Sequence, residues 1–342
     1  MTPPSDRTRT EAEADALELL RSSHRFVLTG HMRPDGDCVG AQAALAGVLR
    51  SLGKEVWILN PDPIEPQFEY LERENDYGVW SGANLPAHDV SVLLDCSELS
   101  RCGELGRALA EYPSKKLVID HHIHTEGEWW DEAFVDVTAS ATGLLVHRIA
   151  RELEVELDPC AAAGVFTSLV TDTGWFKYSN TDAETLKVAG ELAARGVDPN
   201  ALFGSIYQRR SREHPSHTAR ILGTTEYHCG GRLAVIFSPR TGEGGAAAPD
   251  PDDALDLLRS VGTVEVVLYL RELARGKVKL SARSKTDYDV NALARRFGGG
   301  GHRKASGATI EGELEEVLES LVQAAAAGFE SADAPIRGGG DR

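Results

Sequence analysis

Short apolar runs alternate with longer helix-like stretches over the first 180 or so residues of the chain. Strands that are buried on both faces give continuous apolar runs, and strands separated by helices indicate a parallel sheet. We therefore predict an N-terminal domain in which helices cover a parallel sheet. The predicted strands are residues 25–31, 55–60, 90–97 and 116–122. The predicted helices are residues 39–52, 140–153, 159–171 and 182–195.

The pattern changes after Pro199, where residues 200–230 indicate a helix and a polar connector. The strands and helices predicted beyond this connector are strands 232–239, 264–273 and 277–285, with helices 252–261, 289–298 and 314–329. These elements form a second, smaller α/β domain, so the predicted fold class is α/β with two domains. The last residues, 331–342, are predicted to be a disordered tail.

The charge is distributed unevenly. The whole chain carries a net charge of −17, but residues 271–304 contain ten Lys or Arg and only three Asp or Glu. A strongly acidic protein is unsuited to long nucleic acid, because such binding depends on many phosphate contacts. A small basic region on an acidic chain instead favours a small anionic substrate.

Two further observations concern location. No apolar run approaches the roughly 18–20 residues that span a bilayer, and the N-terminus lacks an apolar signal segment, so we expect no membrane partner. The five cysteines contain no CxxC pair and leave one unpaired, which argues against a disulfide framework. We therefore predict a cytoplasmic protein.

Polar residues follow the predicted strands where each one ends. The first strand runs into HMRPDGD, the third into Asp95 and the fourth into an Asp-His-His triplet, and a later helix runs into TDTG. An open α/β sheet gathers such residues in one crevice beyond the carboxyl ends of its strands. The candidates are His31, Asp35, Asp37, Asp95, Asp120, His121, His122 and Asp172.

Each of these pieces alone has an ordinary structural interpretation. Pro-Asp-Gly in HMRPDGD is good turn chemistry, and Asp95 could cap the helix that follows it. Several carboxylates close together repel one another unless a cation neutralises them, however. Four aspartates with two imidazoles and no thiolate suit a pair of divalent metals, with Mn²⁺ or Mg²⁺ favoured over a structural zinc.

The stretch FGGGGHRKASG, residues 297–307, is the second informative segment. Consecutive glycines can expose backbone N–H groups and let a phosphate approach closely, although a flexible loop would look the same. His302 follows the glycines, and Arg283 and Lys285 lie at the end of a predicted strand. The cluster favours anion binding.

In this order, HMRPDGD, LLDCS, IDHH and TDTG resemble the four motifs of the DHH phosphoesterases, and GGGGHRKASG resembles the signature of the DHH-associated C-terminal domain. The likeness spans about residues 20 to 325 and is greatest to the stand-alone nanoRNases. It implies a DHH metal-binding catalytic domain, a linker, a DHH-associated substrate-binding domain and a tail, with the active site in the cleft between the domains. The implied boundaries are 15–197, 198–218, 219–330 and 331–342.

The resemblance also implies a role for each site residue. His31, Asp35 and Asp95 would hold one metal. A second metal would be held by four residues, with Asp95 bridging: Asp37, Asp95, His121 and Asp172. Asp120 would orient its neighbours, and His122 would contact the scissile phosphate and assist proton transfer. The implied substrate-binding residues are Ser281, Arg283, the glycine run of residues 298–301 (Gly299, Gly300 and Gly301 among them) and His302.

The activity implied is two-metal hydrolysis of phosphoester bonds, with Mn²⁺ as the expected ion and Mg²⁺ or Co²⁺ as alternatives. The substrates would be short oligoribonucleotides, cut to mononucleotides, and 3′-phosphoadenosine 5′-phosphate (pAp), converted to AMP. A cyclic di-AMP or pApA phosphodiesterase uses the same kind of site and stays open, as does an inactive nucleotide sensor. The oligomeric state, monomer or homodimer, is also left open.

Overall fold

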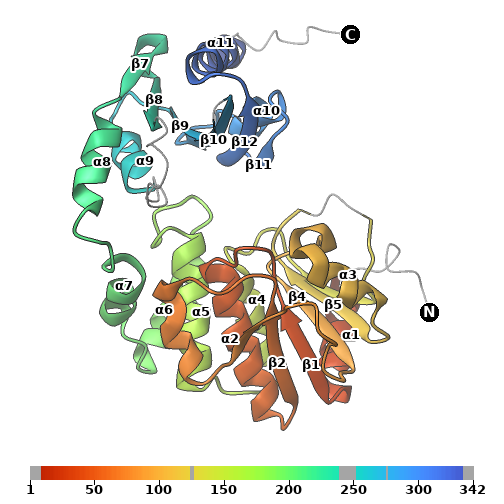
Figure 1. Cartoon of the computed structure of the whole chain (residues 1–342). Helices are drawn as coiled ribbons and strands as arrows, with labels where there is room; N and C mark the ends of the chain where they lie inside the picture. Colours follow the sequence, from red (N-terminus) through yellow and green to blue (C-terminus); the bar gives the residue numbers. More distant parts are fainter. Residues whose placement is uncertain (1–8, 124–126, 239–251, 275, 334–342) are drawn as a thin grey trace, which may run out of the picture. The chain divides into compact units, whose positions relative to one another are not determined.

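The computed structural model describes residues 9–123, 127–238, 252–274 and 276–333. They belong to two compact units that divide between Arg209 and Arg210 (Figure 1). Among the described residues, no helix combines the length and the apolar character needed to cross a bilayer.

The first unit is built on a six-stranded sheet in which every neighbouring pair is parallel. Its strands are β1 (Arg25–Thr29), β2 (Glu55–Asn60), β3 (Tyr77–Val79), β4 (Val90–Leu94), β5 (Lys115–Asp120) and β6 (Glu132–Val135). The order is β3-β2-β1-β4-β5-β6, so the chain changes direction across the sheet between β1 and β4. In sheets of this kind, ligands bind outside the carboxyl ends of the strands at this switch point.

Helices cover both faces of this sheet, as the buried, almost wholly apolar strands require. Phe26 and Leu28 of β1 face a core that α1, α2, α4 and α5 complete, whereas Val27 faces Leu105 and Leu109 of α3. The helices of the first unit are α1 (Arg9–Ser22), α2 (Gly36–Ser51), α3 (Gly103–Glu111), α4 (Thr142–Glu152), α5 (Pro159–Asp172), α6 (Ala183–Ala194) and α7 (Pro199–Tyr207). Two 3₁₀ helices, Pro66–Arg73 and Leu99–Cys102, join them.

The predicted parallel sheet is confirmed, with three corrections. The short strands β3 and β6 were not predicted, because three or four residues are too few to show a pattern. Helices α1 and α3 were also missed. The segment that forms α1 is strongly charged, which hid its helical pattern. The helix predicted from residue 39 begins at Gly36, because Asp35 caps it by accepting the N–H groups of Asp37 and Cys38.

The second unit contains a mixed six-stranded sheet of order β11-β12-β10-β9-β8-β7. Its strands are β7 (Glu226–His228), β8 (Leu233–Ser238), β9 (Val266–Ala274), β10 (Lys277–Ser284), β11 (Gly300–His302) and β12 (Ala305–Glu311). Its helices are α8 (His214–Leu222), α9 (Asp252–Arg259), α10 (Val290–Arg295) and α11 (Leu314–Asp333), with a 3₁₀ turn at Cys229–Gly231. Only the β8–β9 pair is parallel among the described strands of this sheet.

The two faces of this sheet are covered differently. On one face, Leu280 and Ala282 of β10 pack with residues of α10 and α11. On the other, α8 and α9 pack over β8 and β9. Lys279, Ser281 and Arg283 of β10 alternate with buried neighbours and are only partly buried. They share a face of the sheet with the residues opposite them on β9, which are Arg271, Tyr269 and Val267.

The smaller α/β unit is confirmed, and the glycine-rich segment differs from its prediction. We expected an open turn, but residues 300–302 form strand β11, which pairs with β12. The last helix continues to Asp333 rather than ending at residue 329, so residues 331–333 are not part of a tail. The remainder of the predicted tail, 334–342, and the segment of residues 240–251 between a predicted strand and a predicted helix lie outside the described residues.

Candidate metal centre

The switch point between β1 and β4 brings the first two motifs together. His31 follows the end of β1, and Asp95 follows the end of β4, the neighbouring strand. Asp120 is the last residue of β5, so His121 and His122 leave the sheet one strand further along. Parallel strands end at the same edge, and this edge therefore carries the polar residues that the sequence predicted.

A close approach of two helices adds the other carboxylates. Asp37 lies in the first turn of α2 and Asp172 is the last residue of α5. The helices meet at two glycines: a Cβ at Gly40 would lie 2.4 Å from the carbonyl oxygen of Gly164. This contact allows the Ser168 hydroxyl of α5 to donate a hydrogen bond to Asp37.

Asp95 lies between the histidines of two motifs. Its Oδ2 is 3.4 Å from Nε2 of His31, and its Oδ1 is 3.5 Å from Nε2 of His121. Its backbone has a φ of 58°, a left-handed conformation that is uncommon outside glycine and concentrates at functional sites. The hydroxyl of Thr142 donates to Oδ1 at 3.1 Å. Asp95 is thus a buried carboxylate with each oxygen facing a different imidazole.

Both imidazoles present Nε2 to the carboxylates. Nδ1 of His31 lies 2.9 Å from the carbonyl oxygen of Met32, and Nδ1 of His121 lies 3.1 Å from that of Ala139. A carbonyl can only accept, so each Nδ1 carries the proton and, in the neutral ring, Nε2 keeps its lone pair. A ring fixed in this way by an outer hydrogen bond is the form that binds a metal.

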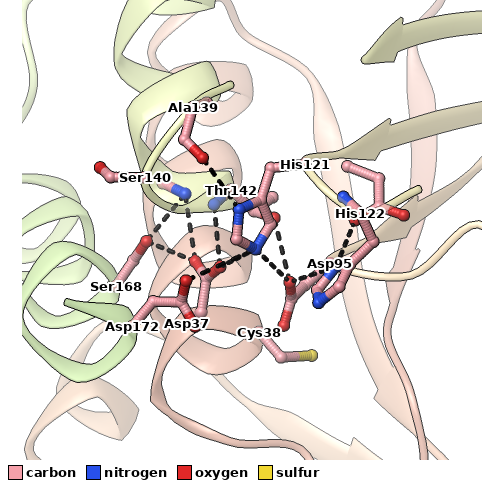
Figure 2. A network of polar contacts seen from close by, with 12 residues as sticks. Asp37, Cys38, Asp95, His121, His122, Ala139, Ser140, Thr142, Ser168 and Asp172 are labelled. Atoms are coloured by element: carbon pink, nitrogen blue, oxygen red, sulfur yellow. Dashed lines mark hydrogen bonds and ion pairs between the residues drawn. The ribbon is translucent and has the colours of Figure 1, made fainter. Parts of the chain in front are cut away.

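The surroundings of His121 Nε2 fit a cation. Carboxylate oxygens of Asp37, Asp95 and Asp172 lie 3.4, 3.5 and 3.7 Å from it (Figure 2). The atom is buried and has no hydrogen-bond partner among the described residues. A buried polar atom of this kind is costly unless it is coordinated. Carboxylate oxygens and an imidazole nitrogen that converge on one point are the ligand atoms that suit a divalent metal.

The structure gathers the predicted ligands into overlapping groups whose ligand atoms lie within 4.8 Å of one another. The groups are His31, Asp35 and Asp95; Asp37, His121 and Asp172; and Asp95, His121 and His122. All six residues that we predicted as metal ligands therefore lie together at this edge. The side chain of Asp35 is exposed and lies at the rim, whereas Asp37 and Asp95 are buried.

The pKa shifts within this centre show how its charged groups act on one another. Burial raises the pKa of Asp37 well above its usual range, and the charge of Asp95 adds to this. Burial acts on Asp95 in the same direction, but interactions with His121 and His31 hold its pKa well below the usual range. Burial alone would lower the pKa of His121, yet Asp95 and Asp37 raise it to about 11. The buried carboxylates therefore favour a positive charge among them.

Asp120 and His122 form a separate pair beside this centre. Asp120 is fully buried, and its Oδ1 accepts from the backbone N–H of His122 at 3.1 Å and from Nδ1 of the same ring at 2.8 Å. Burial lowers the pKa of His122, but the hydrogen bond to Asp120 and the charges of Asp95 and Asp120 together outweigh burial, and the net shift is upward. The carboxylate thus orients the ring and favours its protonated form.

Several polar partners in the centre were not predicted. The backbone N–H groups of Thr142 and Gly143, at the start of α4, donate to the two oxygens of Asp37 at 2.8 and 3.2 Å. The positive end of a helix stabilises a carboxylate in this position. The backbone N–H of Gly143 also donates a hydrogen bond to the hydroxyl of Ser168. These residues belong to no motif that we recognised, and only the packing of helices distant in sequence reveals them.

The predicted substrate-binding residues lie together in the second unit, away from the metal groups in sequence. Across the strands, Ser281 of β10 is opposite Gly307 of β12, which is opposite Gly300 of β11. Arg283 is likewise opposite Ala305, which is opposite His302. The side chain of His302 lies outside the described part of the structure.

The glycines themselves have a structural explanation that the sequence did not predict. The N–H groups of Gly298 and Gly299 donate to the carbonyls of Arg295 and Ala294, so they are not displayed to a ligand. A Cβ at Gly299 would lie 2.1 Å from the carbonyl oxygen of Gly307. Close packing in the β11–β12 hairpin therefore requires a glycine at position 299.

A parallel α/β unit with aspartates and histidines at its switch point, followed by a mixed-sheet unit, defines a candidate metal-dependent hydrolase. The DHH family N-terminal domain matches residues 25–194, and the DHHA1 domain matches residues 236–330. The bifunctional oligoribonuclease and PAP phosphatase NrnA of Thermus thermophilus is 33% identical over 302 residues, which are 86% of this chain and 87% of that protein. The chain belongs to the DHH family, and the predicted class, hydrolases of phosphoester bonds, is confirmed.

Two solved structures share the fold. An exopolyphosphatase-related protein from Bacteroides fragilis matches with a TM-score of 0.85 and 23% identity, over 94% of this chain and 97% of that one. RecJ of Thermus thermophilus in complex with Mn²⁺ matches with a TM-score of 0.53 and 17% identity, over 94% of this chain and 55% of that one. At these identities the likeness establishes the α/β architecture of the two units.

Proposed function

We propose that this protein hydrolyses short oligoribonucleotides to mononucleotides and removes the 3′-phosphate of pAp, using two divalent metal ions. The observation that carries the proposal is the arrangement around Asp95, whose two oxygens face histidines from two ligand groups. The relative from Thermus thermophilus, named for both activities, supports the choice of substrates.

The metal ligands that we propose are the six residues gathered at the sheet edge. His31 and Asp35 would hold one ion and Asp37, His121 and Asp172 the other, with Asp95 shared. Mn²⁺ is the proposed ion because oxygen ligands with some imidazole suit it, and the RecJ structure contains it. A bound pair of such ions polarises phosphoryl oxygens and lowers the pKa of water.

The chain's own groups prepare this chemistry. Asp37 is fixed by the start of α4 and by Ser168, so its carboxylate does not have to reorganise when substrate binds. His122 is oriented by Asp120, and the neighbouring Asp95 and Asp120 favour its protonated form, so it would donate a hydrogen bond or a proton to a phosphate oxygen. We therefore assign His122 to the scissile phosphate and Asp120 to positioning His122.

The second unit would recognise the remainder of the substrate. Lys279, Ser281 and Arg283 are partly buried on one face of β10, beside the β11–β12 hairpin. A surface with two cations and a hydroxyl is suited to a phosphate or ribose group. A surface with only these three candidate residues suits a few nucleotides, and we propose that long duplex nucleic acid is not a substrate.

Location in the cytoplasm stays a prediction from the cysteine pattern.

One experiment tests the proposal as a whole. Purified, metal-stripped protein is supplied with Mn²⁺ and offered RNA dimers to pentamers, an RNA 24-mer, pAp, cyclic di-AMP, pApA and pyrophosphate. We expect turnover of the short RNAs and pAp, and none in chelator. Turnover restricted to cyclic di-AMP and pApA would replace this function with the alternative, and binding without any turnover would indicate a sensor. Sedimentation of the same preparation determines whether it is a monomer or a homodimer.

A further inference from the structure

The loop that follows α5, residues 173–181, has an unusual backbone. Gly174, Trp175 and Phe176 have φ values of 55°, 59° and 64°, so three successive residues are left-handed. This conformation is unfavourable for bulky side chains and persists only where the surroundings determine it. Here the carbonyl oxygen of Thr173 accepts the N–H groups of Lys177 and Tyr178, both at 3.0 Å. The loop is therefore strained and firmly held.

This turn places its three aromatic residues in two different environments. The ring of Trp175 packs against Phe203 and Tyr207 of α7, with centroid distances of 4.9 and 5.8 Å. Phe176 packs against Phe166 of α5. Tyr178, in contrast, is 37% exposed. The backbone packs two half-buried rings against neighbouring helices and leaves the third partly exposed.

Gly174 provides the support for the displayed ring. A Cβ at this position would lie 2.3 to 2.7 Å from Cζ, Cε2 and Cε1 of Tyr178, so only glycine allows the ring to lie there. Nζ of Lys177 lies 5.8 Å from the centroid of the same ring. The ring is thus held against a backbone that belongs to the TDTG motif, with a cation beside it.

The loop is also tied to the metal centre. The side-chain amide of Asn180 donates to the carbonyl oxygen of Asp172 at 3.2 Å, to its carboxylate at 3.4 Å, and to the carbonyl oxygen of Ser140 at 3.1 Å. Other exposed apolar side chains directly follow the site histidines: Met32 after His31, and Ile123 after His122. Exposed apolar groups around a polar site mark a surface that binds a ligand.

We propose that Tyr178 is a specificity-determining residue that stacks against a nucleobase of the substrate, next to the phosphoester at the metal centre. The inference rests on the proposed function, since it concerns the substrate of the same site. Stacking on an exposed aromatic ring tolerates any base, because every base has a π-face. It would let the enzyme select nucleotides over phosphates that lack a base without reading sequence.

A double-mutant cycle between protein and substrate tests this inference. Wild type, Tyr178→Phe and Tyr178→Leu are assayed with Mn²⁺ on the dinucleotide ApA and on two analogues, each lacking one of the two bases. Leucine keeps an apolar side chain over Gly174. We therefore expect Tyr178→Leu to fold, even if a variant with alanine at this position does not. We expect Tyr178→Leu to raise KM for ApA by about 5- to 150-fold with kcat little changed, and Tyr178→Phe to match wild type.

The analogues separate stacking from support of the loop. The wild-type KM for the analogue that lacks the stacked base should already be higher than the wild-type KM for ApA. Tyr178→Leu should not raise the KM for this analogue further. An equal loss on ApA and on both analogues would show that the ring only supports the loop, and would overturn the inference. Tyr227→Leu, which makes the same change at an exposed tyrosine of β7 in the second unit, is the matched control and should leave every KM unchanged. If wild type cleaves none of the dinucleotides, it is the proposed function that fails.

Discussion

Gly40 and Gly164 are in such close contact that a Cβ at Gly40 would lie 2.4 Å from the carbonyl oxygen of Gly164, and one at Gly164 would lie 2.6 Å from that of Gly40. This contact joins α2, which carries Asp37, to α5, which ends at Asp172. The separation of the two carboxylates around His121 thus depends on two residues that have no side chain and touch no ligand.

Gly40→Ala should therefore weaken both folding and metal binding. The methyl group must push apart two backbones, and overpacking of this kind costs about 1–3 kcal/mol of unfolding free energy. We expect a lower melting temperature, a higher Kd for Mn²⁺ and a lower kcat at fixed Mn²⁺. Calorimetry measures the melting temperature and the Kd for Mn²⁺, and steady-state assays measure kcat.

The control for this substitution is Gly190→Ala in α6, where a Cβ would meet nothing within 4 Å. Alanine is the better helix former by about 0.8–1 kcal/mol, so this variant should be more stable and fully active. Normal Mn²⁺ affinity in Gly40→Ala would show that the helix contact does not determine the position of Asp37.

Asp95→Ala should remove turnover while leaving the protein folded. Asp95 is the carboxylate with an oxygen facing each of His31 and His121, so its loss should weaken the binding of both ions. We expect kcat to fall by about 10²- to 10³-fold or more, because charge stabilisation of the transition state is lost. The bound Mn²⁺ per chain should fall from two toward zero in equilibrium dialysis. Near-normal turnover, or retention of two ions, would contradict the shared role.

The ion pair of Arg25 and Asp89 lies at the opposite, amino-terminal edge of the sheet and gives a prediction on stability. Asp89 accepts from the Arg25 guanidinium at 2.7 Å and from the Arg25 N–H at 2.9 Å, and these bonds lower its pKa from 3.8 to about 2. A folded-state pKa below the unfolded value means that the stabilisation is fully present above pH 3.8 and is lost as the pH falls through 2. The contribution is modest because both side chains are partly exposed.

Asp89→Asn should accordingly lower the melting temperature at pH 7, and the difference from wild type should shrink at pH 3. Thermal unfolding at both pH values measures it. Activity at pH 7 should be unchanged, since the substitution is remote from the metal centre. A difference from wild type that is as large at pH 3 as at pH 7 would exclude the ion pair as its cause.

The sequence predicted what local pattern and topology can reveal. The apolar runs before His31, Asp95 and Asp120 identified three neighbouring strands, and the rule that parallel strands end at one edge placed their polar residues together. Contacts between distant segments could not be predicted: Thr142 and Ser168 bind Asp37 only because α4 and α5 pack beside α2. Likewise, the glycines of residues 298–301 have the composition of a loop, and the pairing of Gly300 and Gly301 with β12 depends on tertiary structure.

Arg283→Ala should weaken substrate binding more than it slows the chemical step. Arg283 lies on β10 in the second unit, outside all the motifs that supply metal ligands. A hydrogen bond to a charged group is worth about 1.5–3 kcal/mol, which corresponds to roughly 10- to 150-fold in affinity. A contact made equally in the ground and transition states changes KM and leaves kcat nearly unaltered. We therefore expect KM for an RNA dimer and for pAp to rise within that range.

Two further variants separate this effect from others. Lys285→Ala is the matched control, because Nζ of Lys285 donates to the carbonyl oxygens of Val261 and Gly262, so its loss should affect the stability of the unit and spare KM. Asp37→Asn should show the reverse of Arg283→Ala, with kcat reduced and KM little changed, because Asp37 lies among the metal ligands. Steady-state kinetics on both substrates distinguishes the three variants. An unchanged KM on both in Arg283→Ala would mean that β10 does not contact the substrate through this side chain.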